Sequence, residues 1–236
     1  ELTRKEFYEK LPLSQTSPTT SAPGLGTFAR LYEGLAASGA SQIISIHVSK
    51  ALSNLANVAQ LAAQAASIPV TVIDSHNCSL GTGFLVEAAA QAADAGARLS
   101  EIVHLIEDKI EKIYTLAIVD TTEYLRRSGR VSQFQNSLAS LLGIKPLIKL
   151  HNSIINMEVI RSQKRAVSRL VELLSELKPL HKIALAHTHA VEKVNSLMQE
   201  VYQSFPSVPT LAPTDVSPAI GVHLGPGAVG IICERE

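Results

Sequence analysis

Two segments, QIISIHV at residues 42–48 and VTVID at residues 70–74, decide the fold of this chain. Both are rich in β-branched residues and almost continuously apolar, a pattern typical of strands that are buried on both faces of a parallel sheet. An Ala- and Leu-rich segment at residues 52–66 separates them and predicts the crossover helix that two parallel strands need. We therefore predict an α/β lobe with a parallel sheet in the first half of the chain.

The remaining segments complete two lobes. Further helices of the first half are predicted at residues 2–11, 27–38, 79–95 and 99–112. The second half is predicted to contain strands at residues 115–120, 144–150, 154–160, 182–188, 209–214, 219–225 and 228–234. Its predicted helices are at residues 121–128, 133–142, 163–178 and 190–204. Because His151-Asn152-Ser153 joins two strands as a hairpin, we expect a parallel-sheet lobe at residues 1–112 and a mixed-sheet lobe at residues 113–236.

Composition narrows the function classes. Lys+Arg and Asp+Glu balance at 21 each among 236 residues, and aromatic residues make up 4% without any Trp, so we expect no nucleic-acid partner. No apolar run reaches about 18 residues, so we expect no membrane insertion. Cys78 and Cys233 lack metal-ligand spacing and are predicted to be reduced, which favours a cytoplasmic protein. The chain opens on Glu1 without a Met, so we expect a fragment of a longer protein.

Four polar segments are candidate sites. Thr19 to Gly24 (TTSAPG) precedes a predicted helix, whose N-terminal N–H groups together with the hydroxyls suit a carboxylate or phosphate. Polar residues also follow the two parallel strands, at 47–54 and 73–77, where ligands bind in open α/β sheets. For the hydroxyl residues of these segments, helix capping and turn formation are the alternative roles.

The second half contributes the other two candidates. Residues 126–132 (RRSGRVS) form the densest positive cluster, which suits either an anion or an ordinary solvated surface. Residues 221–228 (GVHLGPGA) place a His beside a Gly-Pro-Gly turn that lets the backbone approach a ligand closely. The alternative is a histidine packed in the core. His187 and His189 form an H-x-H pair, but no nearby Cys or carboxylate supports a metal there, and we predict neither metal nor cofactor. Nucleophile-elbow, zinc-protease and phosphate-loop motifs are all absent from the sequence, which argues against an enzyme.

Taken in order, six motifs resemble the bacterial DegV family. They are Thr20-Ser21-x-Pro23, residues 43–53 (IISIHVSKALS), Ile73-Asp74-Ser75, Glu123-Tyr124-Leu125 leading to Gly129-Arg130-Val131-Ser132, Leu141-Leu142-x-Ile144-Lys145-Pro146, and Gly221-Val222-His223-x-Gly225-Pro226-Gly227-Ala228. The resemblance implies a two-domain α/β protein that binds a long-chain fatty acid, with the acyl chain in an apolar tunnel of the C-terminal lobe. The carboxylate is expected at the domain interface, and a partner fatty acid kinase is expected to phosphorylate it.

The resemblance also implies roles for individual residues. Thr20 and Ser53 are similar to the hydroxyl pair that holds the carboxylate, His223 to the histidine that closes the site, and Arg130 to the arginine beside it. Ser21 and Gly225 complete the predicted ligand-binding set. The family opens with a further strand carrying an Asp-Ser pair, which this sequence does not contain. The usual Ser-Gly-Thr and Ser-Gln-Pro-Ser read Ser53-Asn54-Leu55 and Ser21-Ala22-Pro23-Gly24 here. A kinase-like enzyme, because the first lobe is similar to the dihydroxyacetone-kinase fold, and a regulatory small-molecule-binding module are the alternatives.

Overall fold

The computed structural model describes residues 2–130 and 143–236, which form two compact units. The parallel unit is Ser21–Glu111, and the mixed unit comprises the residues up to Thr20 together with Lys112–Glu236. The predicted helix at residues 133–142 lies outside the described residues.

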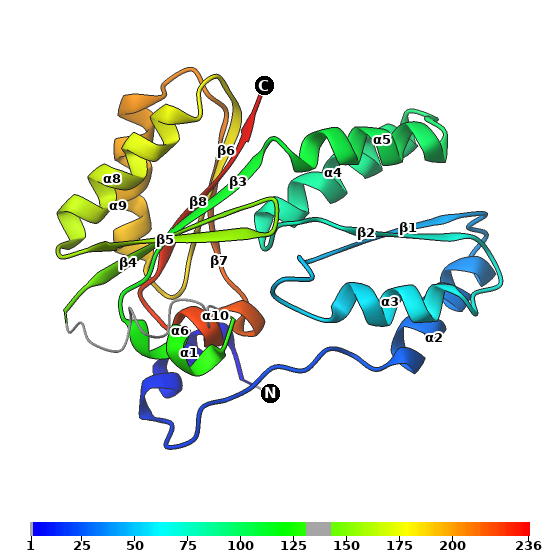
Figure 1. The fold of residues 1–236 in the computed structure, drawn as a ribbon, viewed down its shortest axis with the longest axis horizontal. Helices are drawn as coiled ribbons and strands as arrows, with labels where there is room; N and C mark the ends of the chain where they lie inside the picture. The colour runs from blue at the N-terminus through cyan, green and yellow to red at the C-terminus, as the bar shows by residue number, and fades with distance from the viewer. Residues whose placement is uncertain (1, 131–142) are drawn as a thin grey trace. The chain divides into compact units, whose positions relative to one another are not determined.

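The parallel unit is built on two adjacent parallel strands. In β1 (Ile43–His47) and β2 (Val70–Asp74), Ile43 lies opposite Val70 and His47 opposite Asp74. The helices of this unit are α2 (Leu25–Ala37), α3 (Leu55–Ala63), α4 (Leu80–Asp94) and α5 (Leu99–Ile110). Figure 1 shows α2 and α3 on one side of the strands and α4 and α5 on the other. Apolar residues of α2, α3 and β1 form the core between the first pair and the sheet.

The mixed unit contains a six-stranded sheet with the order β5-β4-β3-β8-β6-β7, in which β6 and β7 are parallel and the other neighbours antiparallel. The strands are β3 (Ile113–Ile118), β4 (Lys145–His151), β5 (Ile154–Ile160), β6 (Leu180–His187), β7 (Thr210–Asp215) and β8 (Val229–Arg235). The α8 (Gln163–Glu176) and α9 (Val191–Ser204) helices cover one face of this sheet (Figure 1). The main core of this unit lies between these two helices and the sheet, and it includes Leu116, Leu170, Ile183 and Leu197.

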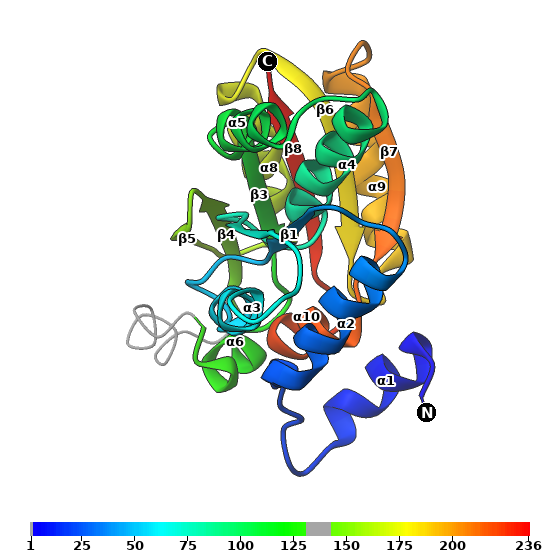
Figure 2. The ribbon, with the colours of Figure 1, turned by 90° about the vertical axis from the view of Figure 1, so that its right-hand side faces the viewer.

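Three short helices gather at one end of this sheet, as Figures 1 and 2 show. They are α1 (Arg4–Lys10), which continues into a 3₁₀ turn at Leu11–Leu13, α6 (Thr122–Ser128) and α10 (Pro218–Leu224). The prediction of a strand at residues 219–225 is therefore wrong. Pro218 in the first turn favours a helix, and Gly225, whose φ is +74°, ends it with its N–H bonded to the Gly221 carbonyl at 2.8 Å.

The first residues of the chain, which we expected in the N-terminal lobe, group with the mixed unit. Tyr8 is 1% exposed, and its hydroxyl donates to the Val216 carbonyl at 2.8 Å. Arg4 donates to the Asp215 carbonyl at 2.9 Å. These bonds join the start of the chain to the segment before α10. The bonded residues are more than 200 positions apart, so local sequence patterns cannot predict their contact.

The predicted fold class, α/β with a parallel sheet followed by a mixed sheet, is confirmed. Among the helices of the described ranges, none has the length and apolar character that a membrane span requires.

Candidate functional site

A hydroxyl–imidazole pair joins the N-terminal loop to α10. Thr20 Oγ1 and His223 Nε2 lie 3.0 Å apart, although the two residues are 203 positions apart in the sequence. His223 occupies the last turn of α10, and both side chains are partly buried. Of the predicted site residues, these two are brought into direct contact.

A small cavity of about 50 Å³ adjoins this pair. The residues that line it are Leu11, Ser17, Pro18, Thr19, Tyr124, Arg127, Ser128, Arg130, Val222 and His223. Its apolar wall consists of Leu11, Tyr124 and Val222, which form one buried cluster together with the partly buried Phe7. Its polar wall contains two guanidinium groups and an imidazole, and no acidic residue stands among the described residues of the lining.

The charges around His223 favour an anion. Loss of hydration on burial, assisted by the nearby Arg130 guanidinium, lowers the pKa of His223 below its ordinary value. The imidazole is therefore neutral at pH 7, and the positive charge of the cavity comes from arginine. Arg127 is tied to Glu123 by an ion pair, whereas Arg130 Nη1 donates to the Ser128 carbonyl at 2.7 Å. An entering carboxylate would meet the neutral His223 imidazole, the Arg130 charge and the hydroxyls of the lining, and the Thr20 hydroxyl lies beside the imidazole.

Gly225 shapes the apolar wall. It is buried, with φ +74° and ψ 174°, a conformation that is essentially restricted to glycine. A Cβ placed on it would lie 2.5 Å from Cε2 of Tyr124, so the ring packs directly on the glycine backbone. Gly225 thus positions the Tyr124 side chain that lines the cavity. The sequence pattern predicted a close approach of this glycine to a ligand, and that role stays a prediction.

Ser21 and Ser53 belong to the parallel unit. Ser21 is exposed, and the Ser53 oxygen accepts a bond from the Leu55 N–H at 3.3 Å at the start of α3. The local role of Ser53 is thus to satisfy a helix N-terminus. The assignment of both hydroxyls to a ligand stays a prediction.

The polar residues after β1 and β2 bond mainly with one another. The Ser75 hydroxyl lies 2.8 Å from the Thr82 hydroxyl, and the Ser49 N–H donates to the Asn77 carbonyl at 2.8 Å. These contacts join the loops that follow the two strands. The predicted crevice at these strand ends therefore contains a bonded polar network, which serves the structure of the loops.

The H-x-H pair has a structural role. His187 Nδ1 accepts a bond from the Ala190 N–H at 3.1 Å and lies 3.6 Å from Asp215 Oδ1, while His189 stacks on Tyr8 with ring centroids 6.1 Å apart. Within residues 2–130 and 143–236, no group of three or more His, Cys, Asp or Glu side chains is arranged to hold a metal ion.

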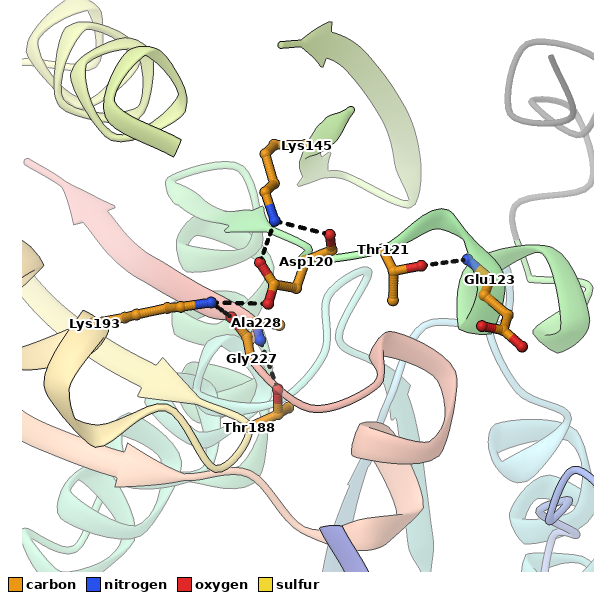
Figure 3. A network of polar contacts seen from close by, with 8 residues as sticks. All are labelled: Asp120, Thr121, Glu123, Lys145, Thr188, Lys193, Gly227 and Ala228. Atoms are coloured by element: carbon orange, nitrogen blue, oxygen red, sulfur yellow. Dashed lines mark hydrogen bonds and ion pairs between the residues drawn. The ribbon is translucent and has the colours of Figure 1, made fainter. Parts of the chain in front are cut away.

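Sequence reasoning missed a charged cluster next to the Gly-Pro-Gly turn. Figure 3 shows the Asp120 carboxylate between the Lys145 and Lys193 ammonium groups, at 2.5 Å and 2.9 Å. We call these three residues the Asp120 clamp. Its members come from the segment that follows β3, the start of β4 and the first turn of α9. They are too distant in sequence for any spacing rule to connect them.

The lowered pKa values of three histidines indicate how the stability of the protein depends on pH. Burial lowers the pKa of His47, His187 and His223, more strongly than Asp74 raises that of His47 or Asp215 that of His187. Since the unfolded chain then binds more protons than the folded chain below about pH 6.5, stability should fall as the pH decreases from 7.5 towards 5. Thermal unfolding across this range checks it.

Two variants define the origin of that pH dependence. His187→Gln should make the decrease of stability less steep, since His47 and His223 still contribute, whereas His104→Gln, a change at an exposed side chain of α5, should leave it unchanged. A melting temperature that is constant or rises towards pH 5 would contradict the prediction.

Known proteins match this chain over nearly its whole length. The family model described as "Uncharacterised protein, DegV family" matches residues 1–236. The protein DegV of Bacillus subtilis is 35% identical over 98% of this chain and 84% of its own length. A DegV domain-containing protein of Streptomyces coelicolor is 34% identical over 91% of this chain and 77% of its own length.

Solved structures agree with the sequence relatives. The crystal structure of DegV, a fatty acid binding protein from Bacillus subtilis, has a TM-score of 0.88 and 33% identity, covering 99% of this chain and 85% of that chain. A fatty-acid-binding DegV family protein from Thermus thermophilus has a TM-score of 0.90 and 29% identity, with 99% and 85% coverage. The whole-chain match of the family model and the identity of these relatives establish that the chain belongs to the DegV family.

Proposed function

We propose that this protein binds a long-chain fatty acid and that Thr20, Arg130 and His223 hold its carboxylate. The observation that carries the proposal is the cavity beside the Thr20–His223 pair, which offers a hydroxyl, an imidazole and guanidinium groups without an opposing acid among the described residues that line it. A buried carboxylate needs such hydrogen bonds and opposite charge. The fatty acid binding named for the Bacillus and Thermus proteins supports the choice of ligand.

The acyl chain is proposed to extend from this site into the apolar interior of the mixed unit. A cavity of about 50 Å³ is far smaller than the roughly 300–1,000 Å³ of typical ligand pockets, so it suits the head group alone. Leu11, Tyr124 and Val222 form the adjoining apolar wall, and we expect them to separate when the chain enters. Each buried methylene then contributes about 0.8 kcal/mol, which favours long chains over short ones.

The carboxylate contacts predict a loss of affinity on mutation. Thr20→Val and His223→Ala should each weaken oleate binding about tenfold, because each removes roughly one net hydrogen bond to a charged group. Displacement of a fluorescent fatty acid measures the dissociation constants. Thr214→Val and His181→Ala change the same residue types at exposed positions of β7 and β6 and serve as matched controls. Equal affinities for all five proteins would remove Thr20 and His223 from the site.

Binding should also be linked to proton uptake. The pKa of His223 is lowered in the free protein, and a carboxylate beside it would favour the imidazolium. Oleate affinity should therefore increase as the pH falls from 8 to 6, because the imidazole in the complex takes up its proton at a higher pH than the imidazole of the free protein does. Calorimetry in two buffers of different ionisation enthalpy measures the proton uptake directly, and His223→Ala should abolish it. Uptake that persists in this variant would assign the proton to another group.

We further propose that the protein carries the fatty acid and presents its carboxylate to a kinase without catalysing a reaction itself. The exposed Arg127 and Arg130 beside the cavity offer a charged surface for such a partner. Burial raises the pKa of the Cys233 thiol to about 12, so this thiol is a poor nucleophile. The free state of Cys78 and Cys233 fits a reducing, cytoplasmic setting. Acyl phosphate should form only when a fatty acid kinase, ATP and the oleate-loaded protein are combined; product formed without the kinase would overturn the carrier role.

A further inference from the structure

The turn after α10 is bonded to one buried threonine. Thr188 is fully buried, and its hydroxyl donates to the Gly225 carbonyl at 2.7 Å and accepts from the Ala228 N–H at 2.8 Å. Its backbone carbonyl also accepts from the Gly227 N–H at 2.7 Å, and its N–H donates to the Ala228 carbonyl at 3.0 Å. Thr188 therefore fixes both ends of the turn formed by residues 225–228, whose first residue lies two positions after His223.

The Asp120 clamp holds the same turn from another side. A Cβ on Gly227, where φ is +88°, would lie 2.6 Å from Asp120 Oδ2, so the carboxylate is packed directly against the backbone of the turn. Lys193 Nζ, which is 2.9 Å from Asp120 Oδ2, also lies 3.4 Å from the Gly227 carbonyl. Lys145 Nζ contacts both the carboxylate and the main-chain carbonyl of Asp120 (Figure 3). The Asp120 clamp thus connects the segment after β3, the start of β4 and the first turn of α9 to Gly227.

The clamp stays charged at physiological pH. Partial burial opposes the ionisation of Asp120, but hydrogen bonds from Lys145 and Lys193 outweigh it and hold the pKa of this carboxyl below its ordinary value. None of the three side chains is more than 39% exposed. Such a partly desolvated triad restricts side-chain motion more than an isolated surface pair does.

The turn is connected to the cavity through two residues that line it, Tyr124 and His223. The Tyr124 ring packs on the backbone of Gly225. The α10 helix also ends at Gly225, and this helix places His223 next to Thr20. A displacement of the turn would therefore move Tyr124 and His223 together. No member of the Asp120 clamp, nor Thr188, belongs to the described lining of the cavity.

We propose that Thr188 and the Asp120 clamp are positioning residues, which hold the turn at residues 225–228 and thereby set the geometry of His223 and Tyr124 for the ligand carboxylate. The ligand part of this inference rests on the proposed function. The clamp acts through the backbone of the turn and touches no ligand atom. Its effect is to keep His223 in the poorly hydrated position that it occupies beside Thr20.

The test compares four variants with the wild-type protein. Asp120→Asn weakens the clamp, Lys193→Gln removes only its more exposed cation, Thr188→Val removes the buried hydroxyl and Thr188→Ser retains it. Glu192→Gln, at an exposed acid adjacent to Lys193 on α9, is the matched control. The measurements are the pKa of His223 by histidine NMR in the absence of ligand and the dissociation constant for oleate.

We expect Asp120→Asn, Lys193→Gln and Thr188→Val to move the pKa of His223 back towards about 6.5, because a loosened turn admits water. Oleate affinity should fall about tenfold in the same three variants, while Thr188→Ser and Glu192→Gln match the wild type. If the folded variants keep the wild-type pKa of His223, the positioning role is wrong, even where stability decreases. Wild-type protein that does not bind oleate, combined with the expected change at His223, would refute the proposed ligand and leave the positioning role intact.

Discussion

Replacing Gly225 with alanine should destabilise the mixed unit by about 4 kcal/mol, because two penalties of roughly 1–3 kcal/mol each combine there. The backbone at φ +74° and ψ 174° is open to glycine and strained for any residue with a Cβ. The added methyl group would also overlap the ring of Tyr124, a residue that is only 8% exposed, so the ring would have to be displaced from the glycine. Chemical denaturation measures the loss, and oleate affinity should decrease with it because Tyr124 lines the cavity.

Gly129→Ala measures the cost of a left-handed backbone without a steric overlap. Gly129 ends α6 with φ +69°, and a Cβ there would have no heavy atom of the described residues within 4 Å, its chain neighbours aside. This variant should lose only about 1 kcal/mol, the cost of a left-handed backbone alone. Equal losses at Gly225 and Gly129 would show that the contact with Tyr124 is unimportant.

Replacing Gly221 with alanine should detach α1 from α10 and cost about 3 kcal/mol. A Cβ on Gly221 would overlap the Tyr8 hydroxyl and lie 2.6 Å from its ring carbon Cζ. Tyr8 is 1% exposed, so the ring can escape only if α1 moves and gives up the bonds from Tyr8 to Val216 and from Arg4 to Asp215. Hydrogen exchange should increase in residues 4–10, and limited proteolysis should cut there first.

A double-mutant cycle tests this explanation. In a Tyr8→Ala background the Gly221→Ala change meets no ring, and alanine should then stabilise α10 by up to about 1 kcal/mol, as its helix propensity predicts. Additive losses from the two changes would contradict the assigned contact. The oleate affinity of Gly221→Ala should also decrease, because Thr20 follows α1 in the chain and faces His223.

The elements that sequence predicts well here are those with a strong local pattern. Residues 42–48 and 70–74 are apolar and β-branched throughout, and they form adjacent parallel strands. The hairpin between β4 and β5 was predicted from His151-Asn152-Ser153, where Asn152 and Ser153 adopt φ of +50° and +63°. In both places the local preference and the tertiary fold favour the same conformation.

The sequence prediction fails where contacts between distant residues determine the secondary structure. Residues 219–225 are almost continuously apolar, which is compatible with either a strand or a short buried helix. Capping by Pro218 and Gly225 and the packing of Tyr8 on Gly221 select the helix. The apolar pattern of residues 219–225 carries no information about Tyr8, which lies at the other end of the chain.

Some residues of the candidate site could be predicted from the sequence and others could not. Thr20, Arg130 and His223 were connected by their resemblance to a family pattern, since no spacing rule links residues 203 positions apart. The Asp120 clamp escaped prediction because an Asp and two Lys in separate elements look like ordinary surface residues in the sequence. Only the fold reveals that the carboxylate lies against Gly227.

Fatty acid binding by this chain can be measured directly by extracting the purified, denatured protein with organic solvent and analysing the extract by mass spectrometry. We expect about one long-chain fatty acid per wild-type chain and much less from a Thr20→Val/His223→Ala double variant, with Thr214→Val/His181→Ala retaining the wild-type amount. An extract without fatty acid, from protein that also fails to take up added oleate, would contradict fatty acid binding by this chain.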